Sequence, residues 1–373
     1  MTEPSKKQQL YEAIRTNPFI SQQELANLLG LSRSAVAGHI AGLIRERKLL
    51  GRAYVLPDRR PIVCVGAANL DRKLRSCDAI VLHTSNPVSQ SESFGGVARN
   101  IAENLARLGS TVALLTAVGA DSAGAALLDH AQALGIDVRG ALRLDNGCSG
   151  TYTAVLDRDG EMVVALADMA LYDRLDPAFI DARQARFAGA ALVVADLNLP
   201  RDTISALVAQ ARRTGTPLVL VAVSEPKMAR LPADLAGVRL LILNAGELAA
   251  RVGRPLPDDD AVRAAMREVR AQDARDLVVT RGARGVLVTN GDTIVDLPAA
   301  PAAVVDVTGA GDAFAAAVCW SLVQEDSSDD LVLACRRGLH LSALTLGVPE
   351  TVHPGTGPDS LAAIDQEPLL PQD

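Results

Sequence analysis

The segment DVTGAGDAF, residues 306–314, combines two glycines with a carboxylate at the start of an apolar run. The run from Ala313 predicts a helix, so the backbone N–H groups from Gly309 onward would converge on an anion such as phosphate. Asp312 stands at the entrance of this helix and would repel a phosphate. Its presence therefore needs an explanation other than phosphate binding.

Three further motifs carry glycines at places where ligands commonly bind. GGVARN, residues 95–100, precedes a predicted helix; its glycines would let a ligand approach closely, and Asn100 can point back toward it. NAGE, residues 244–247, and TRGARG, residues 280–285, each follow a predicted strand. None of these three is specific alone, but together with DVTGAGD and in this order they are highly specific.

The elements that must position these motifs are alternating strands and helices. After the Arg-Arg-Pro at 59–61, buried β runs alternate with alanine-rich helical patterns, which predicts a doubly wound, mostly parallel α/β sheet. Two segments interrupt the alternation: residues 72–94 are polar and extended, and residues 150–168 read as a hairpin that turns at 159–160. We expect both to form a small β lid over the carboxyl edge of the sheet, where open α/β sheets bind ligands.

The first sixty residues have a different pattern. A helical pattern begins near Gln8, and Ser21 with Glu24 forms a capping box for a second helix whose core face would be Leu25, Leu28 and Leu29. A third helix would run from Ser32 to about residue 47, and residues 48–56 read as two short strands around a turn near Gly51.

This order of elements is typical of a winged helix-turn-helix, whose third helix enters the major groove of DNA. Residues 1–60 carry ten Lys and Arg against five Asp and Glu, a charge of +5, whereas the remaining 313 carry −12. The alternative is a small helical domain for protein contacts or dimerisation. For DNA the predicted base contacts are Ser32, Arg33 and Ser34, and the predicted phosphate contacts are Arg45, Lys48 and Arg52.

Composition limits the remaining classes. With 373 residues the chain is long enough for one large and one small domain, and no apolar run reaches the roughly 20 residues of a membrane span. The five cysteines form no CxxC pair, which favours reduced thiols over disulfides or a zinc site. We therefore expect a cytoplasmic protein with a helix-turn-helix at 1–57, an α/β domain at 61–355 and a loose tail at 356–373.

From about Pro61 to Pro354 the chain resembles the ribokinase (PfkB) family of carbohydrate and nucleoside kinases. GAANLD at the first strand, GGVARN, NAGE, TRGARG and DVTGAGDAF carry the resemblance. It implies a ribokinase-like fold with a β lid and transfer of a phosphoryl group from ATP to a primary alcohol. It also implies Mg²⁺ and, in many relatives, a stimulating monovalent cation, K⁺.

The resemblance also implies roles for individual residues. Asp312 would be the general base. The anion hole for the transferred phosphoryl group would be Gly309, Ala310 and Gly311. The sugar hydroxyls would be bound by Asn69, Asp71, Gly95, Gly96 and Asn100. ATP would be bound by Asn244, Glu247, Thr280, Gly282 and Gly285, with Glu247 acting on Mg²⁺ through water. Asp306 and Thr308 would bind K⁺.

The stretches FGGVARNIAENLARLG and GTYTAVLDRDGEMVVALADM resemble the pseudouridine kinase branch and relatives with an N-terminal helix-turn-helix. This implies phosphorylation of a nucleoside 5′-hydroxyl, with pseudouridine as first choice. Residues near the reacting groups and the base would be Thr151, Asp168, Met169 and Asn198. Where relatives have Asp-Pro after the fourth strand, this chain has Val221-Ala222, although Lys227 matches.

Several alternatives remain open at this point. The acceptor could instead be inosine, guanosine, cytidine or free ribose. A different class is a transcription regulator whose kinase-like domain senses a nucleoside, and a protein with both roles fits the same residues. Because helix-turn-helix proteins usually bind DNA as dimers and the lid edge of this family often pairs, we expect a homodimer.

Overall fold

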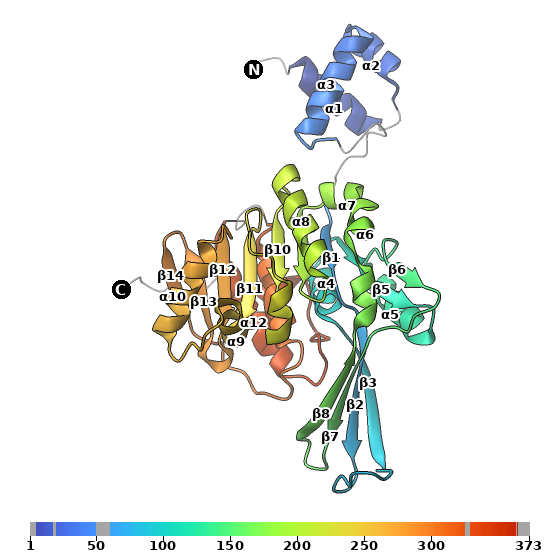
Figure 1. Cartoon of the computed structure of the whole chain (residues 1–373). Coiled ribbons are helices and arrows are strands. Elements are labelled where there is room, and N and C mark those ends of the chain that lie inside the picture. Colours follow the sequence, from blue (N-terminus) through green and yellow to red (C-terminus); the bar gives the residue numbers. More distant parts are fainter. Residues whose placement is uncertain (1–4, 18–19, 50–59, 325–328, 363, 365–373) are drawn as a thin grey trace. The chain divides into compact units, whose positions relative to one another are not determined.

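The computed structural model describes residues 5–17, 20–49, 60–324, 329–362 and 364. The chain divides into two compact units, Met1–Arg60 and Pro61–Asp373 (Figure 1). The boundaries expected from the sequence, 57 and 61, lie next to this division. Each unit is described by itself below.

The N-terminal unit contains three helices, α1 Lys6–Thr16, α2 Gln22–Leu29 and α3 Arg33–Arg45. The Ser21 side chain accepts from the N–H of Glu24 while the Glu24 carboxylate accepts from the N–H of Ser21, so the predicted capping box is present. Ser32 caps α3 through the N–H of Ala35. The buried core consists of Leu10, Ile14, Leu25, Ala26, Val36, Ile40, Leu43 and Leu49.

One prediction for α2 is wrong. Leu28 is 63% exposed, whereas Ala26 is buried beside Leu25. At about 100° per residue, Ala26 and Leu29 lie on one side of Leu25 and Leu28 lies on the other. The contact face of α2 is displaced toward Ala26, which leaves Leu28 outside it. Most of the two short strands expected at residues 48–56, with their turn near Gly51, and the predicted DNA contact Arg52 lie outside the described residues.

The larger unit is organised around an eight-stranded sheet with the order β14-β13-β12-β11-β10-β9-β1-β4. The strands from β4 to β12 are parallel to their neighbours, and β13 and β14 complete the sheet as an antiparallel edge. The predicted doubly wound, mostly parallel fold is therefore confirmed. The strands are β1 Ile62–Val65, β4 Val112–Leu115, β9 Leu192–Asp196, β10 Leu218–Val221, β11 Leu240–Asn244, β12 Asp276–Thr280, β13 Val286–Asn290 and β14 Thr293–Leu297.

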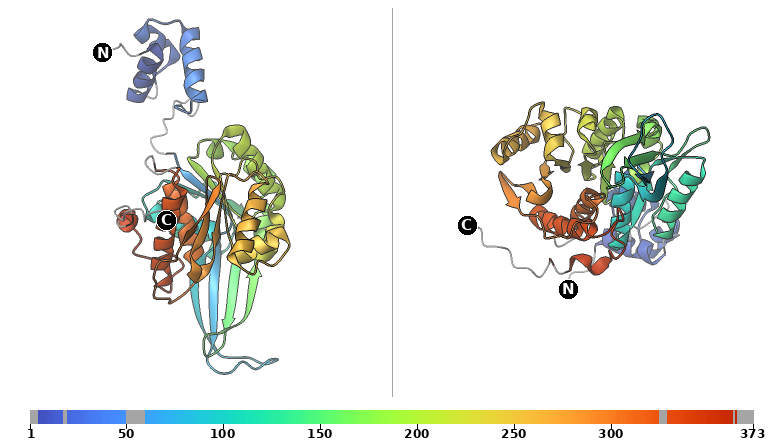
Figure 2. Two further views of the ribbon diagram at one scale, coloured as in Figure 1. Left: turned by 90° about the vertical axis from the view of Figure 1, so that its left-hand side faces the viewer. Right: turned by 90° about the horizontal axis from the view of Figure 1, so that it is seen from below.

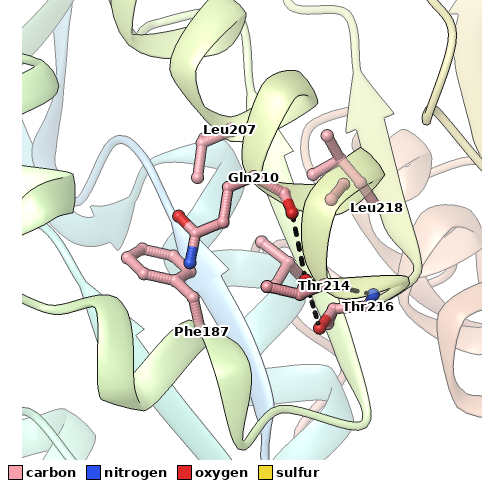
Figure 3. Close-up of a pocket in the computed structure, with 8 residues that line it drawn as sticks. Phe187, Leu207, Gln210, Thr214, Thr216 and Leu218 are labelled. Carbon is pink, nitrogen blue, oxygen red and sulfur yellow. Dashed lines mark hydrogen bonds between the residues drawn. The ribbon is translucent and has the colours of Figure 1, made fainter.

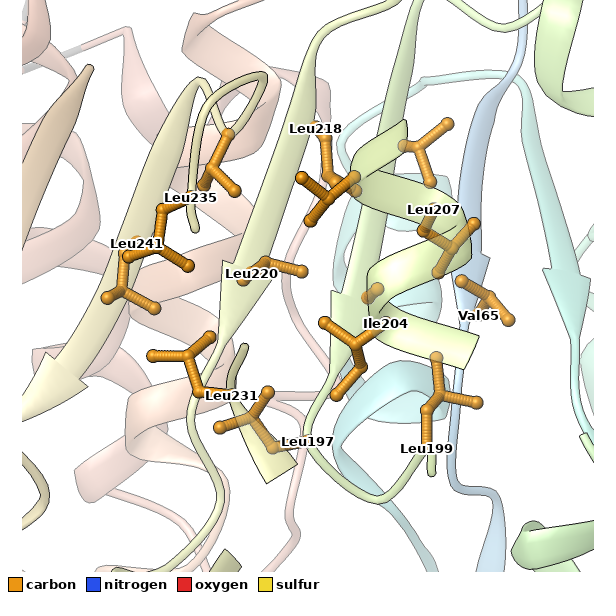
Figure 4. Close-up of a cluster of buried hydrophobic side chains, with 14 of the residues drawn as sticks. Val65, Leu197, Leu199, Ile204, Leu207, Leu218, Leu220, Leu231, Leu235 and Leu241 are labelled. Atoms are coloured by element: carbon orange, nitrogen blue, oxygen red, sulfur yellow. The ribbon is translucent and has the colours of Figure 1, made fainter. Parts of the chain in front are cut away.

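Helices cover both faces of this sheet (Figure 2). Alternate side chains of the buried strands enter two separate apolar layers, as expected for parallel strands covered on both faces. Figure 4 shows one layer, in which Ile204 and Leu207 of α8 lie over the sheet near Leu218, Leu220 and Val65. The helices are α4 Val97–Arg107, α5 Ser122–Ala133, α6 Pro177–Asp181, α7 Gln184–Ala188, α8 Arg201–Thr214, α9 Ala245–Val252, α10 Asp259–Arg270, α11 Ala310–Ser321 and α12 Leu331–Leu346.

A second sheet projects from one end of the first (Figure 1). It has four strands in the order β3-β2-β7-β8, namely β2 Asn69–Ser76, β3 Val88–Gly95, β7 Thr151–Leu156 and β8 Met162–Asp168. These are the two segments expected to form a lid, joined by parallel pairing of β2 with β7. A two-stranded sheet of β5 Ala117–Gly119 and β6 Leu142–Leu144 lies nearby.

The tail predicted at residues 356–373 includes a segment that packs against the domain. A short 3₁₀ helix spans Pro358–Leu361, and Leu361 is buried against Leu108, Ala313 and Leu341. One apolar side chain buried in this way fixes the segment to α11 and α12, which the acidic, proline-rich composition did not indicate. Within the described part of the chain, no helix combines the length and apolar character that crossing a membrane requires.

Candidate active site

Asp196, at the carboxyl end of β9, organises the centre of the sheet edge. Its Oδ2 accepts hydrogen bonds from the N–H groups of Ala67 (2.9 Å) and Ala98 (3.0 Å), and its Oδ1 accepts from the N–H of Asn198 (2.8 Å). The side chain is buried, and burial raises its pKa although these N–H groups act in the opposite direction. Asp196 was not among the site residues predicted from the sequence; its position at the end of a buried strand was the available signal.

The glycines of this edge are required by the packing of the chain itself. A methyl group at Gly66 would overlap the Asp196 carboxylate, and one at Gly96, whose φ is +99°, would overlap the backbone of Ala67. A methyl group at Gly95 would overlap the carboxylate of Asp71. Gly95 and Gly96 are therefore required by the packing of this edge, and their contact with a ligand stays a prediction.

Asp312 lies in the first turn of α11 and receives a hydrogen bond from α4. The Nδ2 of Asn100 donates to its Oδ2 at 2.7 Å, across 212 residues of sequence. Burial raises the pKa of Asp312 to about 7, with Asp196 and Asp71 adding to the rise while Asn100 and Arg99 oppose it. A carboxylate with this pKa can accept a proton near neutral pH.

Asn69 and Asp71 lie at the start of β2, and the charge of Asp71 acts on the Asp312 carboxylate. Asn69 is buried and its Nδ2 donates to Asp71 Oδ1 at 2.6 Å. Burial raises the pKa of Asp71, whereas Asn69, Arg99 and Lys73 lower it. Paired amide and carboxylate groups offer both donors and acceptors to a diol.

Arg99 is a second residue that the sequence analysis did not select, although it lies inside GGVARN. Its side chain is buried, donates to the Phe94 carbonyl and to Asn100 Oδ1, and forms an ion pair with Glu103. It therefore holds Asn100 in the orientation in which the Asn100 amide donates to Asp312.

The N-terminus of α11 has the form of an anion site. Gly309 is its N-cap residue with a φ of +82°, and no side chain caps this helix end. A methyl group at Gly309 would overlap the carbonyl oxygen of Thr351, whereas one at Gly311 would meet open space. The N–H groups of Gly309 and Gly311 can therefore face an anion, whereas the N–H of Ala310 also donates to the Val307 carbonyl at 3.4 Å.

Asn244 and Glu247 form a capping box at the start of α9. The Glu247 carboxylate accepts from the N–H of Asn244 at 2.7 Å, and the Asn244 side chain accepts from the N–H of Glu247 at 2.8 Å. Glu247 is 4% exposed, and burial raises its pKa, aided by the charge of Glu225. In the described residues no group of three or more His, Cys, Asp or Glu could hold a metal ion.

The TRGARG segment begins beside this box, because Thr280 pairs with Asn244 in adjacent strands. Gly282 has a φ of +60° and open space around it. Gly285 is packed: a methyl group there would overlap the Leu297 carbonyl. Of these three predicted ATP contacts, Gly285 must be glycine for packing alone, because no side chain fits beside the Leu297 carbonyl.

The remaining predicted residues lie at the root of the lid and on the neighbouring loops. Thr151 and Asp168 are paired across β7 and β8. The Asn198 side chain accepts from Lys227. The Oδ1 of Asp306 accepts two hydrogen bonds from Thr308, one from its backbone N–H at 2.9 Å and one from its hydroxyl at 2.6 Å.

Two cavities are lined by residues other than the predicted site residues. Figure 3 shows a small one of about 10 Å³ among Phe187, Leu207 and Gln210, which is no larger than a single water molecule. The other, of about 430 Å³, is lined by β2, β3 and α5, including Arg72 and Phe94. Neither is lined by Asp312.

In the N-terminal unit, Ser32, Arg33, Ser34 and Arg45 are all exposed on α3 or at its start. Such a helix end can reach base edges and phosphates.

The fold and the site together place this protein among the ribokinase-like phosphotransferases, which use ATP to phosphorylate an alcohol. Residues 59–356 match the pfkB family of carbohydrate kinases, and residues 5–47 match the winged helix-turn-helix DNA-binding family. The chain therefore belongs to the pfkB family and carries an N-terminal helix-turn-helix.

Curated relatives include both sugar and nucleoside kinases. The chain is 32% identical to the uncharacterized sugar kinase YeiI of Escherichia coli K12, over 87% of this chain and 90% of that protein. It is 30% identical to pseudouridine kinase of the same strain, over 69% and 83%. It is 27% identical to guanosine-inosine kinase of Exiguobacterium acetylicum, over 81% and 99%.

Solved structures share the fold. A carbohydrate kinase from Agrobacterium tumefaciens is 31% identical, with a TM-score of 0.71 over 82% of this chain and 97% of that one. Arabidopsis thaliana ribokinase is 19% identical, with a TM-score of 0.72 over 83% and 99%.

Proposed function

We propose that this enzyme phosphorylates the 5′-hydroxyl of a nucleoside, most favourably pseudouridine, with Asp312 as the general base. The observation that carries the proposal is the hydrogen bond from Asn100 to Asp312 at the head of α11. Asp312, a carboxylate of near-neutral pKa, follows Gly309 in the first turn of the same helix, which supports a role beside N–H groups that stabilise a phosphoryl group.

In this mechanism Asp312 removes the proton from the acceptor hydroxyl as its oxygen attacks the γ-phosphorus of ATP, and the bond to the β-phosphate oxygen breaks. Asn69, Asp71 and Asn100 orient the sugar. The N–H groups from Gly309 to Gly311 stabilise the charge on the transferred phosphoryl oxygens. Positioning and electrostatics supply most of the rate, since phosphoryl transfer needs little covalent help from the protein.

Mg²⁺ fits the residues near α9. Glu247 and Glu225 offer carboxylate oxygens, and the charge of Glu225 adds to the rise that burial causes in the pKa of Glu247, so the two carboxylates act on each other. Mg²⁺ retains much of its water and prefers such oxygen donors, and when bound it neutralises ATP phosphate charge. We propose that Glu247 acts on it through water, with Asn244, Thr280 and Gly282 lining the nucleotide site.

The nucleoside assignment rests on similarity to the pseudouridine kinase and to the guanosine-inosine kinase. The test is ADP production with pseudouridine, inosine, guanosine, cytidine and ribose, followed by ³¹P NMR of the product. Pseudouridine should give the highest kcat/KM. A preference for ribose would exclude a nucleoside kinase. It would still agree with ATP-dependent phosphorylation of an alcohol, the reaction of the family. We expect Thr151, Asp168, Met169 and Asn198 to affect acceptor choice.

A second proposed function is DNA binding, supported by the exposed residues of α3 and the family match. A gel shift on DNA upstream of the gene, with and without the preferred nucleoside, tests it. Replacing Arg33 by alanine should weaken the shift. Glu12→Ala, at an exposed position of α1, serves as a control. A kinase that shifts no DNA would leave the N-terminal unit with a protein-contact role, and a shift that responds to nucleoside would support a sensor.

We also propose a homodimer. The edge strand β8 exposes Met162, Val163, Val164 and Leu166 by 45–61%. Exposed apolar edge strands commonly pair with another chain. Sedimentation analysis should give a dimer for the wild-type chain and a monomer for Val164→Lys; a wild-type monomer would refute this.

A further inference from the structure

Lys73 connects the lid to the loop that leads into the anion hole. It lies on β2, two residues beyond Asp71 and therefore on the same face of the strand. Its ammonium group forms an ion pair with Oδ2 of Asp306, although 233 residues separate the two in sequence. The side chains are 35% and 20% exposed, so the pair is partly shielded from water.

The other oxygen of Asp306 is also engaged. Oδ1 accepts from the N–H and the hydroxyl of Thr308. Both oxygens of this carboxylate are therefore engaged by groups of the chain itself, and the ammonium group of Lys73 stands opposite its charge.

These contacts do not fit the K⁺ ion that the family resemblance implies at Asp306 and Thr308. The carboxylate already has a monovalent cation in contact with it, and the Thr308 hydroxyl points its proton at the same carboxylate. A K⁺ ion beside Asp306 would meet the like charge of Lys73, which disfavours both.

We propose that Lys73 is a tethered monovalent cation, which takes the place of K⁺ at Asp306 and makes the enzyme independent of added K⁺. Lys73 is a positioning residue: it holds Asp306 and Thr308, and through them the turn that begins the anion hole at Gly309. The inference rests on the proposed kinase function for its kinetic readout.

The experiment measures turnover as K⁺ replaces tetramethylammonium at constant ionic strength, using the acceptor preferred in the panel above. The wild-type rate should stay constant. Lys73→Met should lose about tenfold or more without K⁺, the scale of one charge-assisted hydrogen bond, and should recover as K⁺ is added. Lys73→Arg should remain independent of K⁺.

Arg75→Met is the matched control. Arg75 lies on the same strand and face as Lys73 but donates to the Arg158 carbonyl within the lid. The turnover of Arg75→Met should therefore not depend on the K⁺ concentration. Several-fold activation of the wild-type enzyme by K⁺ would overturn the proposal. So would a Lys73→Met variant that keeps full turnover or fails to respond to K⁺.

A second readout does not need turnover. The midpoint of thermal unfolding should be the same in K⁺ and tetramethylammonium for the wild-type chain, and higher in K⁺ for Lys73→Met and Lys73→Gln. A K⁺-dependent wild-type midpoint, or unresponsive variants, would overturn the tethered cation. If no acceptor is phosphorylated, the proposed function fails while the unfolding series still decides this inference.

Discussion

Replacing Asp312 by asparagine removes the proposed base with little change in shape. The hydrogen bond from Asn100 can be kept, because the new side chain retains an amide oxygen that can accept it. The N–H groups of the anion hole belong to the backbone and remain. We therefore expect kcat to fall by about 10²- to 10⁴-fold, the range for general base catalysis, while the Kd for ATP changes little.

The pH dependence follows from the environment of Asp312. Burial raises its pKa to about 7, so the carboxylate is protonated below that pH and loses its capacity to accept the hydroxyl proton. Activity must then fall as pH decreases. Log kcat/KM should drop with unit slope below about pH 7, which gives roughly 100-fold less activity at pH 5.

Two further variants should move this midpoint in opposite directions. Asn100→Ala removes a hydrogen bond that lowers the pKa of Asp312, so the midpoint should move to higher pH. Asp71→Asn removes a negative charge that raises the pKa, so the midpoint should move to lower pH. Steady-state kinetics from pH 5 to 9 in a buffer series of constant ionic strength measure both shifts.

Three results would contradict the assignment of Asp312 as the base. An Asp312→Asn enzyme that retains near-normal turnover would show that another group removes the proton. A wild-type profile that stays flat through pH 7, or shifts of the same sign for Asn100→Ala and Asp71→Asn, would show that the charges around Asp312 do not control the reaction.

Three more predictions concern the frame around the site. Gly309→Ala, which places a methyl group against the Thr351 carbonyl at a φ of +82°, should lower both turnover and the free energy of unfolding; normal values would contradict the packing described. Tyr172→Phe removes a buried hydroxyl that bonds the N–H and carbonyl of Ala68, and should cost about 1–3 kcal/mol in urea unfolding; no change would mean that water replaces it. Glu247→Gln should raise the Mg²⁺ concentration for half-maximal rate by about 10-fold or more, and an unchanged value would exclude Glu247 from the Mg²⁺ site.

Local features were predictable because they depend on neighbouring residues. The capping box of Ser21 and Glu24 is closed within a single turn, and its residues are visible in the sequence. The parallel sheet followed from apolar runs separated by helical patterns. Leu28 shows the limit, because helical periodicity identifies an apolar stripe but not the side of it that meets the neighbouring helices.

The sequence by itself determined the family, the reaction and the order of the motifs. Only the tertiary structure decided which charges meet at the site. Asn100 with Asp312 and Lys73 with Asp306 are each separated by more than 200 residues, and Asp196 joins three backbone segments. Such contacts depend on how the lid, α4 and α11 converge at one edge of the sheet, which no local pattern specifies. For that reason the sequence indicated a K⁺ site at Asp306, where the folded chain places its own lysine.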